Sequence, residues 1–377
     1  MKRLTFFLTI LSFSYLLQAQ EYHQWEVVDL AFEAKVSQED PHAVSFDCTF
    51  THESGEELSV PGFYNGAKEW IIRFSPPKVG SWTYTTQSAL KKLDGKKGEL
   101  TVSEVAPGQK GPIQLSTEHA QRFTYADGTP YYLMAYELDW LFALDWQNQE
   151  DIPKSKQIIN TISSRGFNQV VMNVYAYDAN WGERDKIDPR HDYAKPTVYP
   201  FGGSNEEPDF DELNIPFFQH LDRVIAYLNK KNVVSHLMIY VWNKNVNWPE
   251  ARSPEDNRYF DYVVKRYQAY PNLVWDISKE ALGYGHNDMS YISDRIDRLR
   301  SLDAHKRLVS VHDYQYCSNF PEKVDFISIQ EWVPNLYNSM RGVVEKYPSK
   351  PIFNIEHGGY DQTMHAIFWG AYADPLE

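Results

Sequence analysis

The sequence predicts an α/β barrel preceded by a small all-β sandwich, and three observations lead to this fold class. Short runs in which apolar and polar residues alternate fill residues 21–106, with turn residues between them. A segment rich in Pro and Gly at residues 107–112 is typical of a linker. From residue 113 to 377, apolar runs of strand length alternate with segments of helical spacing, which is the order that a parallel barrel requires.

The first 20 residues stand apart from both units. Lys2 and Arg3 precede an apolar stretch at residues 4–17, which is the layout of a signal peptide. We therefore expect an exported protein, periplasmic or extracellular, and no later run is long enough for a membrane span. Removing this segment takes two of the 37 basic side chains and none of the 51 acidic ones, which leaves a formal charge of −16. Such a charge makes nucleic acid and anionic membrane surfaces poor partners, and we expect neither nucleic-acid binding nor a membrane span.

Five stretches of the first unit have the composition of strands. The clearest is residues 43–51, where apolar and polar side chains alternate strictly, as in a half-buried strand. The other four are residues 25–34, 68–74, 81–86 and 98–102.

Strand–helix units follow the linker and predict a TIM (β/α)8-type barrel. Strands are expected at residues 131–140, 168–175, 233–242, 273–278, 308–311, 326–329 and 351–355. Helices are expected at residues 152–165, 217–231, 254–270, 290–301 and 335–346, with another near Thr363. An eighth strand is missing, so the barrel is either truncated at its C-terminus or closed in an unusual way.

Two glutamates end apolar strands of this barrel. Glu280 follows the fourth strand and Glu356 ends the seventh. Catalytic groups of such barrels lie at the C-terminal ends of the strands, and strands four and seven face one another across the mouth. Retaining glycoside hydrolysis needs a protonated carboxyl and an ionised carboxylate about 5–5.5 Å apart. We therefore expect Glu280 and Glu356 to be the catalytic carboxylates.

This pattern resembles the large clan of retaining barrel glycosidases called clan A. The resemblance implies that Glu280 is the acid/base and Glu356 the nucleophile. Residues 123–132 resemble the opening of apiosidase-like barrels. A domain of unknown function that precedes such barrels is resembled by residues 25–26, 61–66, 70–76 and 80–84. The resemblance covers nearly the whole mature chain and is specific for family but not for substrate. We expect a retaining glycoside hydrolase that acts on a plant or algal polysaccharide or oligosaccharide.

The sequence departs from clan A directly before the acid/base. Clan A has an Asn there that binds the sugar 2-hydroxyl, whereas this chain has Lys279. Lys279 therefore either binds an acidic or sulfated substituent of the substrate or points into solvent. The apiosidase-like relatives also use an Asp as acid/base where this chain has Glu280, so apiose itself is not implied.

Other carboxylates support alternative functions. Glu331 ends the sixth strand and is the main rival, and strand parity leaves open whether it or the face of Gln330 and Trp332 points inward. An inverting hydrolase that uses Asp178 or Glu331 is one alternative. A non-catalytic carbohydrate-binding protein on a degenerate barrel is another, and Lys279 is the feature that favours it.

Aromatic and polar residues at the strand ends are candidate sugar contacts, because the apolar faces of sugar rings stack on aromatic planes. Packing in the core explains each of them equally well. The substrate-binding candidates are Trp140, Tyr175, Tyr177, Trp181, Trp242, Lys279, His312, Trp332 and His357, with Glu137, Asp139, Asp178, Asn243 and Asp313 beside them. His236 and Asp276 lie within strands and are expected to be hydrogen-bonded core residues.

Cys48 and Cys317 fall in different units of the chain. We expect two buried free thiols, with a disulfide between them as the alternative. No cluster of side chains has metal-ligand spacing and no phosphate-binding loop occurs, so neither a metal nor a cofactor is expected. The sugar, the linkage and the oligomeric state are left open by the sequence.

Overall fold

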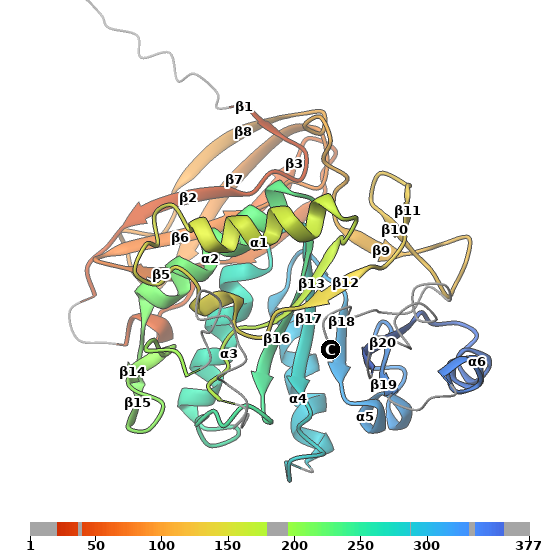
Figure 1. Cartoon of the computed structure of the whole chain (residues 1–377). Coiled ribbons are helices and arrows are strands. Elements are labelled where there is room, and N and C mark those ends of the chain that lie inside the picture. The colour runs from red at the N-terminus through yellow and green to blue at the C-terminus, as the bar shows by residue number, and fades with distance from the viewer. Residues whose placement is uncertain (1–20, 37–39, 179–194, 287, 332–335, 358–377) are drawn as a thin grey trace, which may run out of the picture.

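The computed structural model describes residues 21–36, 40–178, 195–286, 288–331 and 336–357. Within these ranges the fold is mixed α/β, with β-sheets at the N-terminal end followed by alternating strands and helices (Figure 1). Several expected features lie outside the described residues. They are the signal peptide, the helix near Thr363, Trp181 and Trp332. The expectation about the eighth strand concerns residues 358–377, which also lie outside the described ranges.

Two sheets form the N-terminal unit. Their strands are β1 (Glu21–His23), β2 (Val28–Glu33), β3 (Phe46–His52), β4 (Glu57–Pro61), β5 (Phe63–Gly66), β6 (Glu69–Phe74), β7 (Gly80–Ser88) and β8 (Lys97–Ser103). One sheet has the order β1–β8–β7–β3–β4 and the other β2–β6–β5. The alternation expected for β3 is confirmed, because Phe46, Cys48 and Phe50 are buried there. Phe50 stacks on Phe74 of the second sheet, so both sheets share one core.

Seven parallel strands follow, close to the expected positions. The strands β12 (Ala135–Glu137), β13 (Gln169–Asn173), β16 (Val234–Val241), β17 (Leu273–Lys279) and β18 (Val309–His312) pair in this order. A second parallel pair consists of β19 (Ile327–Glu331) and β20 (Ile352–His357). The backbone N–H of Asp325, just before β19, donates to the carbonyl of Val309 in β18 at 2.8 Å, which joins the two groups.

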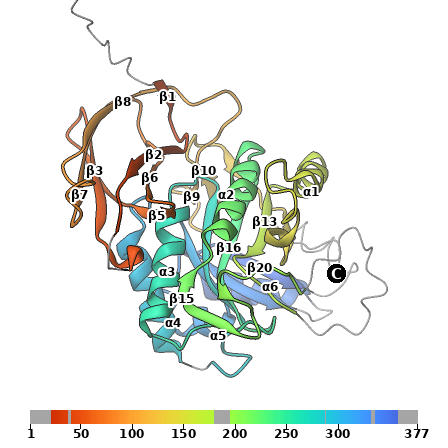
Figure 2. The ribbon, with the colours of Figure 1, turned by 90° about the vertical axis from the view of Figure 1, so that its left-hand side faces the viewer.

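Helices separate these strands and cover the outside of the sheet (Figure 2). They are α1 (Pro153–Ser164), α2 (Ile215–Lys230), α3 (Pro254–Tyr267), α4 (Met289–Leu302), α5 (Tyr314–Asn319) and α6 (Leu336–Lys346). Three begin at side chains that accept a hydrogen bond from the first turn, namely Asn214, Ser253 and Asp288. The short helix α5 was not expected from the sequence.

Two parts of the sequence prediction are wrong in detail. The apolar run at 131–140 is not one strand, because Pro130–Tyr131 forms β11 and only Ala135–Glu137 forms β12. The strand β11 pairs with β10 (Phe123–Tyr125), which pairs with β9 (Ile113–Leu115), in a separate antiparallel sheet. The long loop after β13 also contains a hairpin of β14 (Phe201–Gly203) and β15 (Pro208–Leu213).

The parallel strands curl around a common apolar cluster. Ala135 of β12, Val171 of β13, Val274 of β17 and Ile355 of β20 belong to one group of buried residues. Phe123 of the antiparallel sheet belongs to the same group and packs against Phe326 and Phe353. The first and last strands therefore approach each other, although no backbone pairing joins β20 to β12 within the described residues.

Buried charges join the N-terminal sheets to the helices. Arg73 of β6 pairs with Asp29 of β2 at 2.8 Å and with Asp222 of α2 at 3.1 Å. Asp222 also accepts from Arg266 of α3 at 2.6 Å. The side chains of Arg73 and Arg266 are 5% and 1% exposed and that of Asp222 is 15% exposed, so their pairs are largely shielded from water, whereas Asp29 is 42% exposed.

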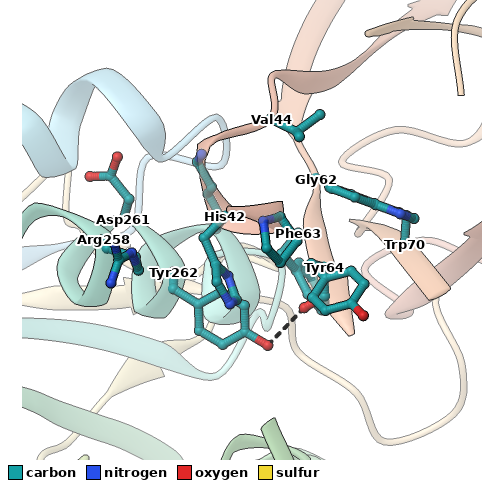
Figure 3. A pocket seen from close by; sticks show the side chains of 11 residues that line it. His42, Val44, Gly62, Phe63, Tyr64, Trp70, Arg258, Asp261 and Tyr262 are labelled. Atoms are coloured by element: carbon teal, nitrogen blue, oxygen red, sulfur yellow. Dashed lines mark hydrogen bonds between the residues drawn. The ribbon is translucent and has the colours of Figure 1, made fainter. Parts of the chain in front are cut away.

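A small cavity lies beside this junction (Figure 3). Residues of the N-terminal sheets and of α3 line it, and Tyr262 donates a hydrogen bond to the carbonyl of Tyr64 at 3.0 Å. It measures about 20 Å³, which is space for a water molecule and not for a sugar.

Cys48 and Cys317 are both buried free thiols, as predicted. Burial raises the pKa of each thiol to about 12, which keeps both protonated. None of the helices in the described part of the chain combines the length and apolar character needed to cross a membrane.

Candidate active site

Glu280 leaves the end of β17 in an unusual backbone conformation. Its φ is 58°, in the left-handed region that residues other than Gly seldom adopt. The pairing of β17 with β18 shifts register between Asp276 and Lys279, and such an irregularity redirects the end of a strand. The backbone N–H of Glu280 still donates to the carbonyl of His312 at 3.2 Å, so the turn stays attached to β18.

Asp276 holds this strand end in place. It is fully buried, and its Oδ1 accepts from the backbone N–H of Ser278 at 3.1 Å and of His312 at 2.9 Å. Its Oδ2 lies 3.2 Å from Nε2 of His236, whose Nδ1 lies 3.0 Å from the amide of Gln169. Asp276 and His236 are therefore the hydrogen-bonded core residues that the sequence predicts.

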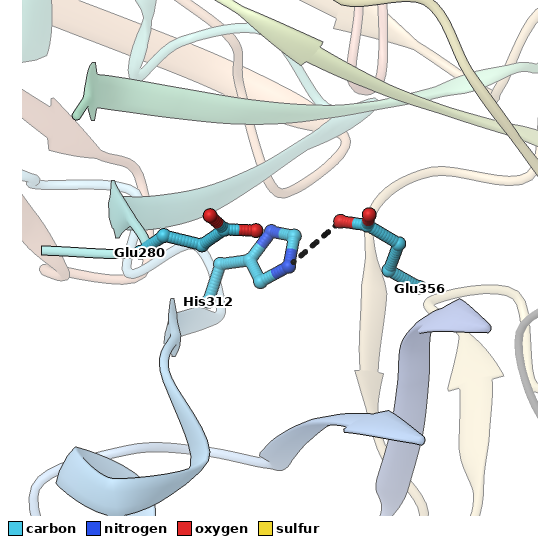
Figure 4. A group of neighbouring side chains, drawn as sticks. All are labelled: Glu280, His312 and Glu356. Atoms are coloured by element: carbon cyan, nitrogen blue, oxygen red, sulfur yellow. Dashed lines mark ion pairs between the residues drawn. The ribbon is translucent and has the colours of Figure 1, made fainter. Parts of the chain in front are cut away.

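Glu356 faces Glu280 from β20, and Gln330 lies between them. The register of β19 and β20 places Gln330 opposite Glu356. Gln330 Nε2 donates to Glu280 Oε1 at 2.7 Å and to Glu356 Oε2 at 3.0 Å. A carboxylate oxygen of each glutamate and a ring nitrogen of His312 all lie within 4.8 Å of one another (Figure 4). The two carboxyl groups are thus close enough to act on one bond.

The rival carboxylates lie outside this arrangement. Glu331 follows Gln330 and is contacted by Ser339 of α6, so the face of Gln330 is the one that turns inward. This contact answers the question, left open by the sequence, of which face of the sixth strand points inward. Asp178 is buried and lies 3.1 Å from Nζ of Lys195.

Lys279 is buried among acidic side chains. Its ammonium group contacts Glu137 and lies 3.5 Å from Asp139 Oδ1 and 3.5 Å from Glu356 Oε2. Its side chain is 2% exposed, so the expectation that it points into solvent is wrong. The other expectation, a contact with an acidic substituent, stays a prediction, and three acidic neighbours already compensate this charge.

The cluster around Lys279 has a definite pattern of ionisation. Burial raises the pKa of Glu356, but the charge of Lys279 and the contacts with His312 and Gln330 outweigh it and lower the pKa to about 2. Burial also raises the pKa of Asp139, and the charges of Lys279 and Lys244 outweigh it, so the net shift is downward. Glu356 is consequently an ionised carboxylate at neutral pH.

Glu137 differs from its neighbours. Burial, assisted by the negative charges of Asp139 and Glu356, raises its pKa well above the ordinary value in spite of Lys279. Lys279 itself keeps its charge, because the attraction of the acidic neighbours exceeds the cost of burial and raises its pKa. Glu137 and Asp139 were expected as sugar contacts, but the structure places both against a lysine.

The predicted aromatic contacts are not all alike. Tyr175 is fully buried and packs against Phe142 and Tyr199, so the core explanation holds and its assignment to substrate binding is corrected. Trp140 is buried, and its indole donates to the carbonyl of Tyr177 at 3.2 Å. The hydroxyl of Tyr177 donates to Glu206, which fixes its ring.

Trp242 remains the best placed aromatic residue. It is half-buried, its backbone N–H donates to the carbonyl of Lys279 at 3.1 Å, and its ring stacks on His286 at 3.6 Å.

Of His357 only the backbone is described, so the role of its side chain stays a prediction, as do those of Trp181 and Trp332. Asn243 follows Trp242, and its Oδ1 is buried with no hydrogen-bond partner among the described residues.

His312 is the polar candidate that lies closest to the pair. It is fully buried at the end of β18, and its Nε2 lies 3.5 Å from Glu356 Oε2. Its Nδ1 has no hydrogen-bond partner in the described part of the chain. Glu280, His312 and Glu356 could surround an ion, but the ammonium group of Lys279 lies 3.5 Å from Glu356 Oε2 and repels cations. We therefore assign no metal to them.

Sequence reasoning missed the role of Gln330 in this site. Gln330 was noted only for its strand parity, and its bridging position depends on the register of two strands.

Comparison with known families agrees with this geometry. Residues 117–373 match the model of the apiosidase-like catalytic domain, and residues 21–89 match a domain of unknown function, DUF5060. The chain therefore belongs to the apiosidase-like catalytic domain family. The predicted resemblance to apiosidase-like barrels is confirmed, as is the resemblance to the N-terminal domain that precedes them.

Solved structures give a similar result. One from Bacteroides vulgatus, provisionally described as a glycoside hydrolase, is 25% identical, with a TM-score of 0.76 over 90% of this chain. This chain spans 65% of that protein's length. A family 5 glycoside hydrolase from the same organism is 14% identical, with a TM-score of 0.48 over 70% of this chain and 62% of its own. A comparison with curated proteins found no match to this chain.

Proposed function

We propose that this protein is a retaining glycoside hydrolase in which Glu356 is the nucleophile and Glu280 the acid/base. Glu356 attacks the anomeric carbon while Glu280 protonates the leaving oxygen, and Glu280 then activates water to release the sugar. The observation that carries the proposal is the spacing of the two carboxylates, which have oxygens within 4.8 Å of each other. Inverting enzymes need about 6.5–9.5 Å between carboxyl groups to hold a water molecule.

The environments of the two carboxylates support these roles. A nucleophile must be ionised, and Lys279 lowers the pKa of Glu356. Glu280 lies at the more accessible end of β17, where a leaving group and a water molecule can reach it. Gln330 donates hydrogen bonds to both carboxylates and so holds them on the same side of the site.

The proposal includes a closed TIM-type barrel as the scaffold. Side chains of β12, β17 and β20 meet at Lys279, and those of β12 and β20 share an apolar cluster. A flat sheet would keep its first and last strands apart, so these contacts favour closure. The substrate is proposed to be a plant or algal polysaccharide or oligosaccharide, met outside the cytoplasm after export.

The test is a screen of the purified protein on plant and algal polysaccharides and on a panel of aryl glycosides. The variants Glu280→Gln and Glu356→Gln should each lose about 10³-fold or more of the activity. Glu331→Gln is the matched control, because it removes a carboxylate one residue from Gln330 and should leave turnover within a few-fold. Full activity in both site variants would refute the assignment.

The alternative is a carbohydrate-binding protein without turnover. The feature that favoured it was the lysine in place of Asn, and the pairing of Lys279 with Glu137, Asp139 and Glu356 gives that lysine a place in an ionised site. Binding of an oligosaccharide by calorimetry, with no product after prolonged incubation, would favour the alternative.

A further inference from the structure

The two oxygens of Glu356 have different surroundings. Oε2 lies 3.0 Å from Gln330 Nε2, 3.5 Å from Lys279 Nζ and 3.5 Å from His312 Nε2. These donor groups come from β19, β17 and β18; Gln330 makes a hydrogen bond with Oε2, and the nitrogens of Lys279 and His312 lie at ion-pair distance. No described residue donates a hydrogen bond to Oε1. One oxygen of the carboxylate is therefore held and the other is left for a substrate.

Lys279 is the charged member of these three donors, and its own position is fixed. Its ammonium group contacts Glu137 and lies 3.5 Å from Asp139 Oδ1. Lys244 in turn lies 2.9 Å from Asp139 Oδ2. Since the side chains of Lys279, Glu137 and Asp139 are 2%, 7% and 8% exposed, solvent screens these charges weakly.

Resting on the proposed function, we infer that Lys279 is a positioning residue that holds Oε2 of Glu356, so that Oε1 is the attacking oxygen. Oε1 forms the ester bond to the anomeric carbon, and the bond to the leaving oxygen breaks as that oxygen takes the proton of Glu280. Water then adds to the anomeric carbon, returns a proton to Glu280 and releases Glu356. Lys279 gives and takes no proton in either step.

This role has a consequence for the pH dependence. The charged or titratable groups around Glu356 are Lys279, His312 and Glu280 in contact range, with Glu137, Asp139 and Lys244 behind Lys279. A nucleophile with a lowered pKa stays active until the pH falls through that low value. Removal of Lys279 takes away the charge that most lowers the pKa of Glu356 and leaves burial, which raises it, opposed by His312 and Gln330. The pH below which activity is lost should then be higher than in the unchanged protein.

The test is a titration of Glu356 by carbon NMR on protein labelled at the glutamate carboxyl carbons, with Glu356→Gln to assign the signal. In Lys279→Met the pKa of Glu356 should rise by about 1–3 pH units. Lys244→Met is the matched control, because it removes a buried lysine of the same cluster that pairs with Asp139. In Lys244→Met the pKa of Glu356 should rise by less than half as much as in Lys279→Met.

Activity gives the second readout. On the best aryl glycoside of the panel, Lys279→Met should move the acid limb of kcat/KM upward and lower kcat more than it changes KM. A merely structural lysine would leave the pH profile in place. If Lys279→Met does not fold, Lys279→Met with Glu137→Gln replaces both partners of this buried contact, and the same upward shift in the pKa of Glu356 is expected.

The outcomes separate this inference from the proposed function, because the titration needs no substrate. An unchanged Glu356 titration in a folded Lys279 variant overturns the inference, whether or not the protein hydrolyses a glycoside. A shifted titration without any hydrolysed substrate supports the role of Lys279 in holding Glu356 and counts against the proposed hydrolysis.

Discussion

At the residue scale, Glu280 combines a strained backbone with a precise hydrogen bond. A residue other than Gly at φ 58° costs about 1–3 kcal/mol, and such strain persists where surrounding contacts enforce it. Asp276 and the irregular pairing with β18 supply those contacts. The result is a carboxylate directed at Gln330, 2.7 Å away, and through it at Glu356.

Glu280→Ala is predicted to separate the two steps of the reaction. A dinitrophenyl glycoside has a leaving group that needs no proton, so the first step should continue and the glycosyl-enzyme should accumulate. Azide, a nucleophile that needs no general base, should then restore turnover and yield a glycosyl azide. Steady-state rates with and without azide, with Glu356→Ala as control, check this. The absence of azide rescue would contradict the acid/base role.

The sequence was sufficient to predict that Glu280 and Glu356 lie near each other, but it did not predict the side chains around them. Glu280 and Glu356 were predicted because each ends an apolar strand, a property of local sequence. The environment of Lys279 could not be predicted, because Glu137 and Asp139 lie about 140 residues away and meet it only through the curvature of the sheet. Gln330 depends on the register of β19 with β20 for the same reason.

At the scale of elements, the ends of β17 and β18 are joined by one buried carboxylate. Asp276 accepts from two backbone N–H groups and faces His236, all away from water. A buried donor that loses its partner costs about 1–3 kcal/mol, so this residue determines where both strand ends lie.

Asp276→Ala should therefore lower the free energy of unfolding by about 3–5 kcal/mol, because it leaves several buried donors unpaired. Asp276→Asn keeps one acceptor oxygen and should lose clearly less. Urea unfolding followed by fluorescence measures both. Equal stability of the alanine variant and the unchanged protein would show that Asp276 does not fasten the strands.

Helices and strands differed in how well their sequences predicted them. The helices α1 to α4 begin and end near the expected residues, because capping side chains and apolar spacing are local signals. The apolar run at 131–140 forms two separate strands because β11 pairs with β10. Apolar composition alone does not predict that pairing, which depends on tertiary contacts. The hairpin of β14 and β15 was missed for the same reason.

At the scale of the whole molecule, the N-terminal sheets and the helical face are joined by buried ion pairs. Asp222 lies between Arg73 and Arg266, so removing its charge takes from Arg266 the carboxylate it pairs with and leaves Arg73 with Asp29. Tyr262 adds a hydrogen bond to Tyr64 across the same junction. The two units should consequently unfold together.

Asp222→Asn is predicted to lower the free energy of unfolding by about 3–5 kcal/mol, as expected when a buried pair loses one partner. Arg341→Met is the matched control, because its pair with Glu345 is more than half exposed on both sides and should change stability by about 0.5 kcal/mol or less. Calorimetry should show one transition in the unchanged protein. Two well-separated transitions would contradict a shared junction.

The central claim is that Glu280 and Glu356 act as a retaining pair. The most direct measurement is proton NMR of the reaction mixture during the first minutes of hydrolysis of the best aryl glycoside in the panel. The account predicts that the first sugar released has the same anomeric configuration as the substrate, before mutarotation. Initial release of the opposite anomer would contradict it, because two carboxylates with oxygens within 4.8 Å of each other would then not act by double displacement.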